Sequence, residues 1–232
     1  MNNTFVKKTV LATVLAFVAG QAMAAGDSVD IKVSGEFMPA ACNLTLSGGG
    51  TVDYGAIKAE TIAKDDFTML DVKTLDLSIT CEAATKLALH TTDMRADSVV
   101  LPTGKSWGNG DSVGAKALGL GKESDKNIGG WAMWMAGDTI KADGNPVTGI
   151  ILNGTPSATN NRWSIPSNKH TWLTPTGTYY RSWAAPGTDT PIALTTLTGT
   201  LSVQVGINKG SELDLTKAVH LDGMATLQVF YL

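Results

Sequence analysis

The chain has 232 residues, and its 18 basic and 21 acidic side chains give it a net charge of −3. A negative balance without any run of Lys or Arg excludes the electrostatic footprint by which proteins bind nucleic acid or anionic membranes. The length is sufficient for one substantial hydrophobic core or two small ones.

Residues 1–24 are typical of a secretory signal peptide. Lys7 and Lys8 form its positive region, residues 10–19 are apolar, and residues 22–24 (Ala-Met-Ala) form an A-x-A cleavage site. The apolar stretch is about half as long as a membrane-spanning helix requires. We therefore expect an exported, soluble mature protein with no membrane insertion after cleavage of the signal.

The mature chain begins with a predicted strand inside residues 25–38. Four apolar side chains and one glycine alternate with polar residues there: Val29, Ile31, Val33, Gly35 and Phe37. This period of two indicates a strand with one face that requires burial. A strand near a chain terminus is easily left unpaired in its own fold, and unpaired strands recruit other chains. We expect self-assembly by strand exchange.

The next zone, up to about Leu101, alternates predicted strands with short turns. Residues 75–81 form one alternating face, and residues 87–89 begin the following strand. Cys42 and Cys81 are the only two cysteines. Export to an oxidising compartment predicts a disulfide, which would stabilise the fold by roughly 3–4 kcal/mol. Two free buried thiols are the alternative.

The middle zone, residues 102–191, contains all but one of the eight prolines and all six tryptophans. It predicts short strands such as Gly149 to Asn153, linked by long loops. The tryptophans either fill a small core beneath these loops or form a surface that stacks on a ligand such as a sugar. The six are Trp107, Trp131, Trp134, Trp163, Trp172 and Trp183.

The last zone returns to strict alternation, over residues 197–207 and again over residues 221–231. In the terminal strand we expect Leu227, Val229 and Tyr231 to face the core, with a free backbone edge beside them. Many short strands, Gly/Pro turns and no convincing amphipathic helix predict one all-β sandwich over residues 39–232.

Motifs for catalysis or metal binding fail on their context. Two G-x-S-x-G matches, at residues 104–108 and 110–114, are not followed by the helix that a nucleophile elbow requires. The three histidines show no metal-ligand spacing, and no calcium-loop pattern is present. We expect no enzyme activity, no cofactor and no metal.

Four segments together resemble a chaperone–usher fimbrial subunit, or pilin, and most closely the beta-fimbrial branch and its uncharacterised exported relatives in Gram-negative bacteria. They are residues 33–42 (VSGEFMPAAC), 52–55 (VDYG), 75–81 (LDLSITC) and 221–232, with a penultimate tyrosine. Both ends of the mature chain carry this resemblance, and the middle zone adds little to it.

The resemblance implies an immunoglobulin-like sandwich that lacks its last strand. A periplasmic chaperone would supply a strand beside Leu227, Val229 and Tyr231, and the N-terminal segment of a neighbouring subunit would replace it at an outer-membrane usher. The function implied is that of a structural subunit of a surface fimbria that supports adhesion.

Two alternatives remain open from the sequence: a minor or tip adhesin, and a free periplasmic β-sandwich that binds glycans. A tip adhesin needs no N-terminal donor strand, because no further subunit is added beyond it. The alternating segment before Cys42 therefore favours a subunit within the fibre.

Overall fold

The structure is a computed structural model, and the residues it describes are 32, 34, 41–113, 117–167, 170–173 and 178–232. The predicted signal peptide and the predicted donor residues Val29, Ile31, Val33, Gly35 and Phe37 lie outside the described residues. The described part from residue 41 onward belongs to one compact unit, Pro39–Leu232.

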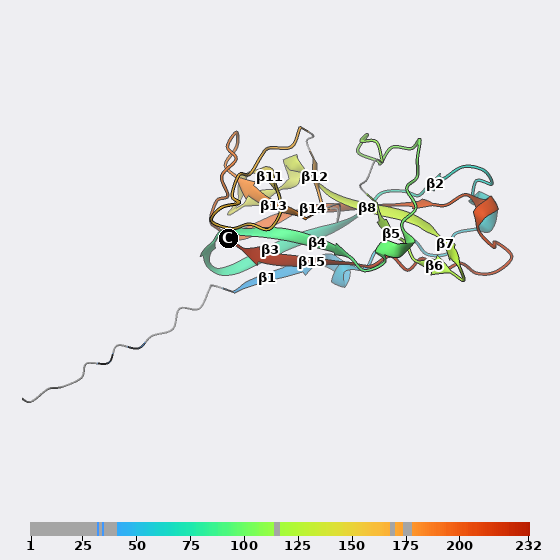
Figure 1. The fold of residues 1–232 in the computed structure, drawn as a ribbon, viewed down its shortest axis with the longest axis horizontal. Coiled ribbons are helices and arrows are strands. Elements are labelled where there is room, and N and C mark those ends of the chain that lie inside the picture. The colour runs from blue at the N-terminus through green and yellow to red at the C-terminus, as the bar shows by residue number, and fades with distance from the viewer. Residues whose placement is uncertain (1–31, 33, 35–40, 114–116, 168–169, 174–177) are drawn as a thin grey trace, which may run out of the picture. The chain divides into compact units, whose positions relative to one another are not determined.

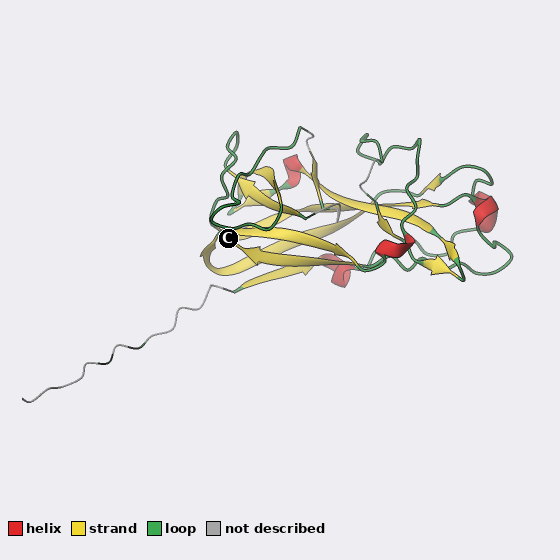
Figure 2. Ribbon diagram, viewed as in Figure 1, coloured by secondary structure: helices red, strands yellow, loops and turns green. Residues whose placement is uncertain are grey.

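Within the described residues the chain forms fifteen strands, five short 3-10 helices and no α-helix. Figure 2 shows the helices as single turns between strands. The strands are β1 (Cys42–Leu46), β2 (Thr68–Met69), β3 (Lys73–Thr85), β4 (Leu87–Asp93), β5 (Leu118–Gly119), β6 (Lys122–Glu123), β7 (Lys126–Asn127), β8 (Gly129–Ala136), β9 (Lys141–Ala142), β10 (Asn145–Pro146), β11 (Thr148–Asn153), β12 (His170–Trp172), β13 (Tyr179–Ala184), β14 (Leu194–Ile207) and β15 (Ala225–Tyr231). The 3-10 helices are η1 (Ser47–Gly50), η2 (Ala59–Thr61), η3 (Ala96–Ser98), η4 (Gly137–Thr139) and η5 (Gly210–Glu212).

Two antiparallel sheets form a sandwich in the described part of the chain (Figure 1). The larger sheet has the strand order β1-β3-β14-β8-β12, and the smaller has the order β11-β13-β4-β15. These orders leave β1 and β15 as edge strands, each hydrogen-bonded to a strand on one side only. The predicted all-β fold is confirmed, and the arrangement is consistent with an immunoglobulin-like sandwich.

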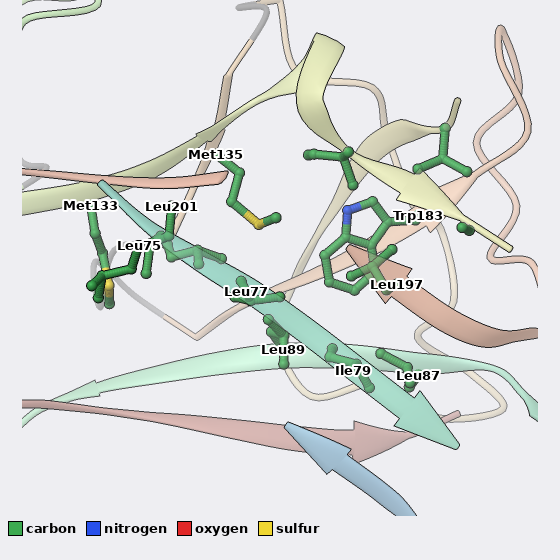
Figure 3. Packing of buried hydrophobic residues seen from close by; sticks show 14 of the residues in the cluster. Leu75, Leu77, Ile79, Leu87, Leu89, Met133, Met135, Trp183, Leu197 and Leu201 are labelled. Atoms are coloured by element: carbon green, nitrogen blue, oxygen red, sulfur yellow. The ribbon is translucent and has the colours of Figure 1, made fainter. Parts of the chain in front are cut away.

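The main core lies between the two sheets. Leu77 and Ile79 of β3 are almost fully buried, as are Leu87 and Leu89 of β4 and Trp183 of β13. Figure 3 shows these side chains meeting in the space between the strands. Alternation along each strand sends every second side chain inward, and each fully buried apolar side chain stabilises the fold by roughly 1.5–3 kcal/mol.

The middle zone supplies two smaller clusters, built from side chains that alternate with those of the main core. On the larger sheet, Trp134 and Trp172 pack together with Trp107. Along β13, Tyr180 points the opposite way from Trp183 and packs with Trp163. The long loops of this zone therefore cover apolar side chains on the outer faces of the sheets.

The predicted disulfide between Cys42 and Cys81 is confirmed. The two cysteines stand opposite each other in the β1–β3 ladder, with Asn43 paired to Thr80 next to them. The bond therefore ties the edge strand β1 covalently to its neighbour.

Within the described residues, the strand predictions agree with the structure except at one place. Residues 75–81 lie within β3, Gly149–Asn153 within β11 and residues 197–207 within β14. The terminal strand begins at Ala225, so residues 221–224 continue the alternation in sequence without belonging to a strand.

Candidate strand-binding cleft

An apolar cleft of about 720 Å³ lies in the part of the sandwich away from the C-terminus. Its floor is the inner face of the larger sheet, with buried side chains from β14 at its centre. The floor residues on this sheet are Leu75, Trp131, Met133, Leu201, Val203, Val205 and Ile207, and Leu120 and Ile128 next to the sheet complete the floor.

Two irregular segments form the walls of the cleft. The first wall is residues 46–62, which begin at the last residue of β1, and the second is residues 213–227, which end within β15. Residues 51–58 and 218–224 lie in no strand, although both stretches contribute apolar side chains to the cleft. The two walls therefore extend the edge strands β1 and β15, and neither extension is paired with another strand.

The walls lie close over the floor. Val203 and Val205 line the cleft and yet are only 5% and 4% exposed. On the walls, Tyr54, Ile57 and Leu221 pack against a cluster that includes Val205. The cleft is therefore a partly closed apolar space, and a chain segment could enter it only if the walls moved apart.

The first wall is held by Tyr54. Its hydroxyl donates a hydrogen bond to the carbonyl of Val203, 3.2 Å away, and burial raises the pKa of Tyr54 to about 12. Lys73 adds two contacts, because its Nζ lies 5.1 Å from the centre of the Tyr54 ring and donates to the carbonyl of Asp53 at 2.6 Å. One aromatic ring therefore anchors this wall to the floor.

The second wall is held by a pair of charges. Arg95 donates from Nε and Nη2 to the Asp222 carboxylate at 2.8 and 3.2 Å. The hydrogen bond and charge of Arg95 lower the pKa of Asp222 below its usual range. Two backbone bonds act beside this pair, from Asp222 N to Leu120 O at 3.0 Å and from Met94 N to Met224 O at 2.9 Å.

Floor and second wall meet at Trp131. Its indole Nε1 donates to the carbonyl of Gly119 at 2.9 Å, which fixes the ring. A Cβ at position 223 would lie 2.6 Å from this Nε1, so only glycine fits there. Gly223, part of the alternating sequence of residues 221–231, therefore permits the second wall to pass the edge of the Trp131 ring.

A hydrogen bond closes the sandwich at the end nearest the C-terminus. The backbone N–H of Cys42 donates to the hydroxyl of Tyr231 at 2.9 Å and so joins the two edge strands. Leu227 and Val229 pack against the main core as half-buried side chains, whereas Tyr231 is 40% exposed. Tyr231 thus contacts β1 through its hydroxyl, and its ring is not buried in the core as the sequence predicted.

The tryptophans are distributed between packing and the cleft. Trp107, Trp134, Trp163, Trp172 and Trp183 are buried in the clusters described above. Their burial agrees with the packing interpretation and leaves their rings no open face for stacking on a ligand. Trp131, half-buried, is the member of the set that lines the cleft.

The described residues contain no group of three or more His, Cys, Asp or Glu side chains that could hold a metal ion. In the same residues, no helix has the length and hydropathy needed to span a membrane.

Comparisons with known proteins identify the family of this chain. Residues 31–132 match a family model described as "Protein of unknown function (DUF1120)". The chain is 30% identical over 239 residues to the uncharacterized protein YhcF of Escherichia coli (strain K12), covering 94% of this chain and 95% of that protein. It is 28% identical over 247 residues to the protein GltF of the same organism, covering 93% of each. The chain therefore belongs to the DUF1120 family.

Proposed function

We propose that the protein is a structural subunit of a surface fimbria and that its cleft binds an extended segment, from within residues 25–38, of a second copy of the chain. The observation that carries this proposal is the apolar cleft between two edge strands whose extensions have no partner strand. A β-strand inserted there would pair with backbone on both sides and cover the apolar floor.

The sequence before Cys42 has the properties that such a cleft requires. Its apolar side chains repeat with a period of two, which matches the alternating floor residues of β14. Burying Ile31, Val33 and Phe37 would each stabilise the complex by roughly 1.5–3 kcal/mol. The walls can separate to admit the strand, because few hydrogen bonds hold them and residues 51–58 and 218–224 belong to no strand.

The proposed assembly requires two further partners. A periplasmic chaperone covers the cleft until an outer-membrane usher delivers the subunit to the growing fibre, where the neighbouring subunit provides the strand. The signal peptide and the disulfide fit a protein that passes through the periplasm to the cell surface.

The test is binding of a fluorescently labelled peptide, residues 27–37, to the mature protein, measured by fluorescence anisotropy. The peptide with Ile31→Asp should bind at least about tenfold more weakly, because it places a charge against an apolar floor. The peptide with Lys32→Asp is the matched control and should bind nearly as well as the unchanged peptide, since the period of two would point residue 32 away from the floor. Absence of binding by the unchanged peptide, or equal weakening by the two substitutions, would contradict the proposal.

A further inference from the structure

The hydrogen bond between β1 and β15 lies beyond one end of the cleft, four residues along each strand from the last lining residue. The lining residues nearest this bond are Leu46 and Leu227, while Cys42 and Tyr231 lie beyond them and outside the lining. We infer that the hydroxyl of Tyr231 closes this end of the cleft and so limits the length of strand that the cleft accepts. This inference rests on the proposed function.

The N–H of Cys42 points to the free edge of β1, so the Tyr231 hydroxyl accepts a hydrogen bond that the carbonyl of an inserted strand could accept. Glu82 donates its backbone N–H to the carbonyl of Ala41 at 3.0 Å, so that carbonyl points toward β3. The N–H of Cys42 belongs to the same planar peptide and therefore points the opposite way, to the free edge of β1. There it meets the Tyr231 hydroxyl, at the position that a carbonyl of an inserted strand would otherwise occupy.

Both partners in this bond are fixed by the sheets that carry them. The disulfide to Cys81 holds Cys42 on the larger sheet. Tyr231 stands opposite Leu87 in the β15–β4 ladder, and the next residue bonds from Leu232 N to Lys86 O at 3.0 Å. The hydroxyl therefore connects the two sheets where their strands are regular, whereas the walls of the cleft are irregular and able to move.

The length of strand that the cleft can hold follows from the length of its floor. Along β14 the lining runs from Leu201 to Ile207. At about 3.3 Å per residue this stretch spans roughly 20 Å, which is room for about seven residues of an inserted strand. Residues 31–37 match that length, and Val29 would have to extend past the end of the cleft.

Antiparallel pairing with β15 brings Val29 to the closed end. The edge strands β1 and β15 run in opposite directions, because Cys42 lies beside Tyr231 while Leu46 and Leu227 both line the cleft. A strand between them is therefore antiparallel to one and parallel to the other, and we take the orientation antiparallel to β15, the orientation in which β15 already pairs with β4. A strand inserted antiparallel to β15 places its N-terminal end beside Tyr231. An extension from residue 31 back to residue 27 therefore meets the Cys42–Tyr231 bond directly.

The test compares two peptides, residues 31–37 and 27–37, on three mature proteins: the wild type, Tyr231→Phe, and Tyr179→Phe as a control that removes a hydroxyl from β13. On the wild type and on Tyr179→Phe, the two peptides should bind with equal affinity within about twofold. On Tyr231→Phe, the longer peptide should bind about tenfold more tightly, as expected for one additional buried valine, and the shorter peptide should be unchanged.

The outcomes separate this inference from the proposed function. If the longer peptide already binds the wild type more tightly and Tyr231→Phe changes nothing, the closure is wrong and the strand-binding cleft remains. An equal gain for both peptides on Tyr231→Phe would also overturn the limit on length. If neither peptide binds any of the three proteins, the proposed function fails and the closure fails with it.

Discussion

The two halves of β14 have the same sequence pattern and different surroundings. Leu197, near its start, is fully buried in the main core, where strands of the smaller sheet cover it. Val205, near its end, belongs to the cleft, where irregular segments cover it. We refer to the first part of the sandwich as the closed half and to the second as the open half. Alternating apolar residues show that a face requires burial, and they do not show what buries it.

The difference arises from the lengths of the strands in the two sheets. In the larger sheet, β3 has 13 residues and β14 has 14. In the smaller sheet, β4 and β15 have 7 residues each. The larger sheet therefore extends beyond the smaller one, and its apolar inner face continues where no opposing strand is available. The two walls of the cleft cover this part of the larger sheet.

The largest expected contrast between the halves comes from two tryptophans. Trp183→Ala in the closed half should lower the free energy of unfolding by roughly 3–5 kcal/mol, because the cavity it leaves is enclosed on all sides. Trp131→Ala in the open half should cost clearly less, since its ring is half-buried and the walls can move inward. Urea denaturation of both variants measures the difference. Equal losses would show that the open half is packed as rigidly as the core.

The disulfide is the next test, because it lies in the closed half, where β1 begins. Replacing both cysteines by serine removes a link between residues 39 positions apart. The free energy of unfolding should fall by roughly 3–4 kcal/mol. Denaturation of the wild type in the presence of dithiothreitol is the matched measurement and should give a similar loss. If the variant binds the peptide of residues 27–37 as tightly as the wild type, β1 holds its place by backbone pairing alone.

Much of the closed half could be predicted from the sequence. Period-two alternation over residues 75–81 and 197–207 located two central strands, and export with two cysteines predicted the bond from Cys42 to Cys81. These features are local, since each depends on a residue and its near neighbours along the chain.

The open half depends on contacts that no local pattern records. The alternation of residues 221–231 did not show that the strand begins only at Ala225, because that depends on where β4 ends. The alternation of the terminal strand did not show that the Tyr231 hydroxyl meets the N–H of Cys42, because these two residues are far apart in sequence. Trp131 could not be separated from the other tryptophans, although Gly223, which it requires, was visible in the terminal pattern.

A smaller effect is expected at Asp143, at the edge of the closed half. Its carboxylate accepts the backbone N–H groups of Thr195 and Thr196 at 3.0 and 2.7 Å, and bonds from the Thr195 hydroxyl and these N–H groups lower its pKa. Because the pKa is lower in the folded state, the stabilisation is complete above the unfolded-state pKa of about 3.9 and is lost as pH falls through the folded-state pKa.

The variant Asp143→Asn tests this pH dependence. Asparagine tolerates the positive φ of 48° at this position, so the change removes the charge and keeps the backbone. Thermal denaturation should show the wild type losing stability more steeply than the variant as pH falls below about 4. Parallel curves for the two proteins would show that the folded and unfolded states bind this proton equally.

The smallest global effect, and the sharpest local one, is expected at Asp222 on the second wall. The pair with Arg95 is largely exposed on the Asp222 side, so Asp222→Asn should lower the free energy of unfolding by only about 0.2–1 kcal/mol. Residues 218–224 lie in no strand, so losing this pair should speed amide hydrogen exchange in the wall while leaving β4 and β15 unchanged.

A wall that opens more often also admits a strand more often, and the peptide of residues 27–37 should therefore bind faster to the Asp222→Asn variant. Asp214→Asn is the matched control, because Asp214 pairs with Lys217 at 3.5 Å, within its own segment. If wall exchange and peptide association are the same in both variants, the Arg95–Asp222 pair does not hold the cleft closed.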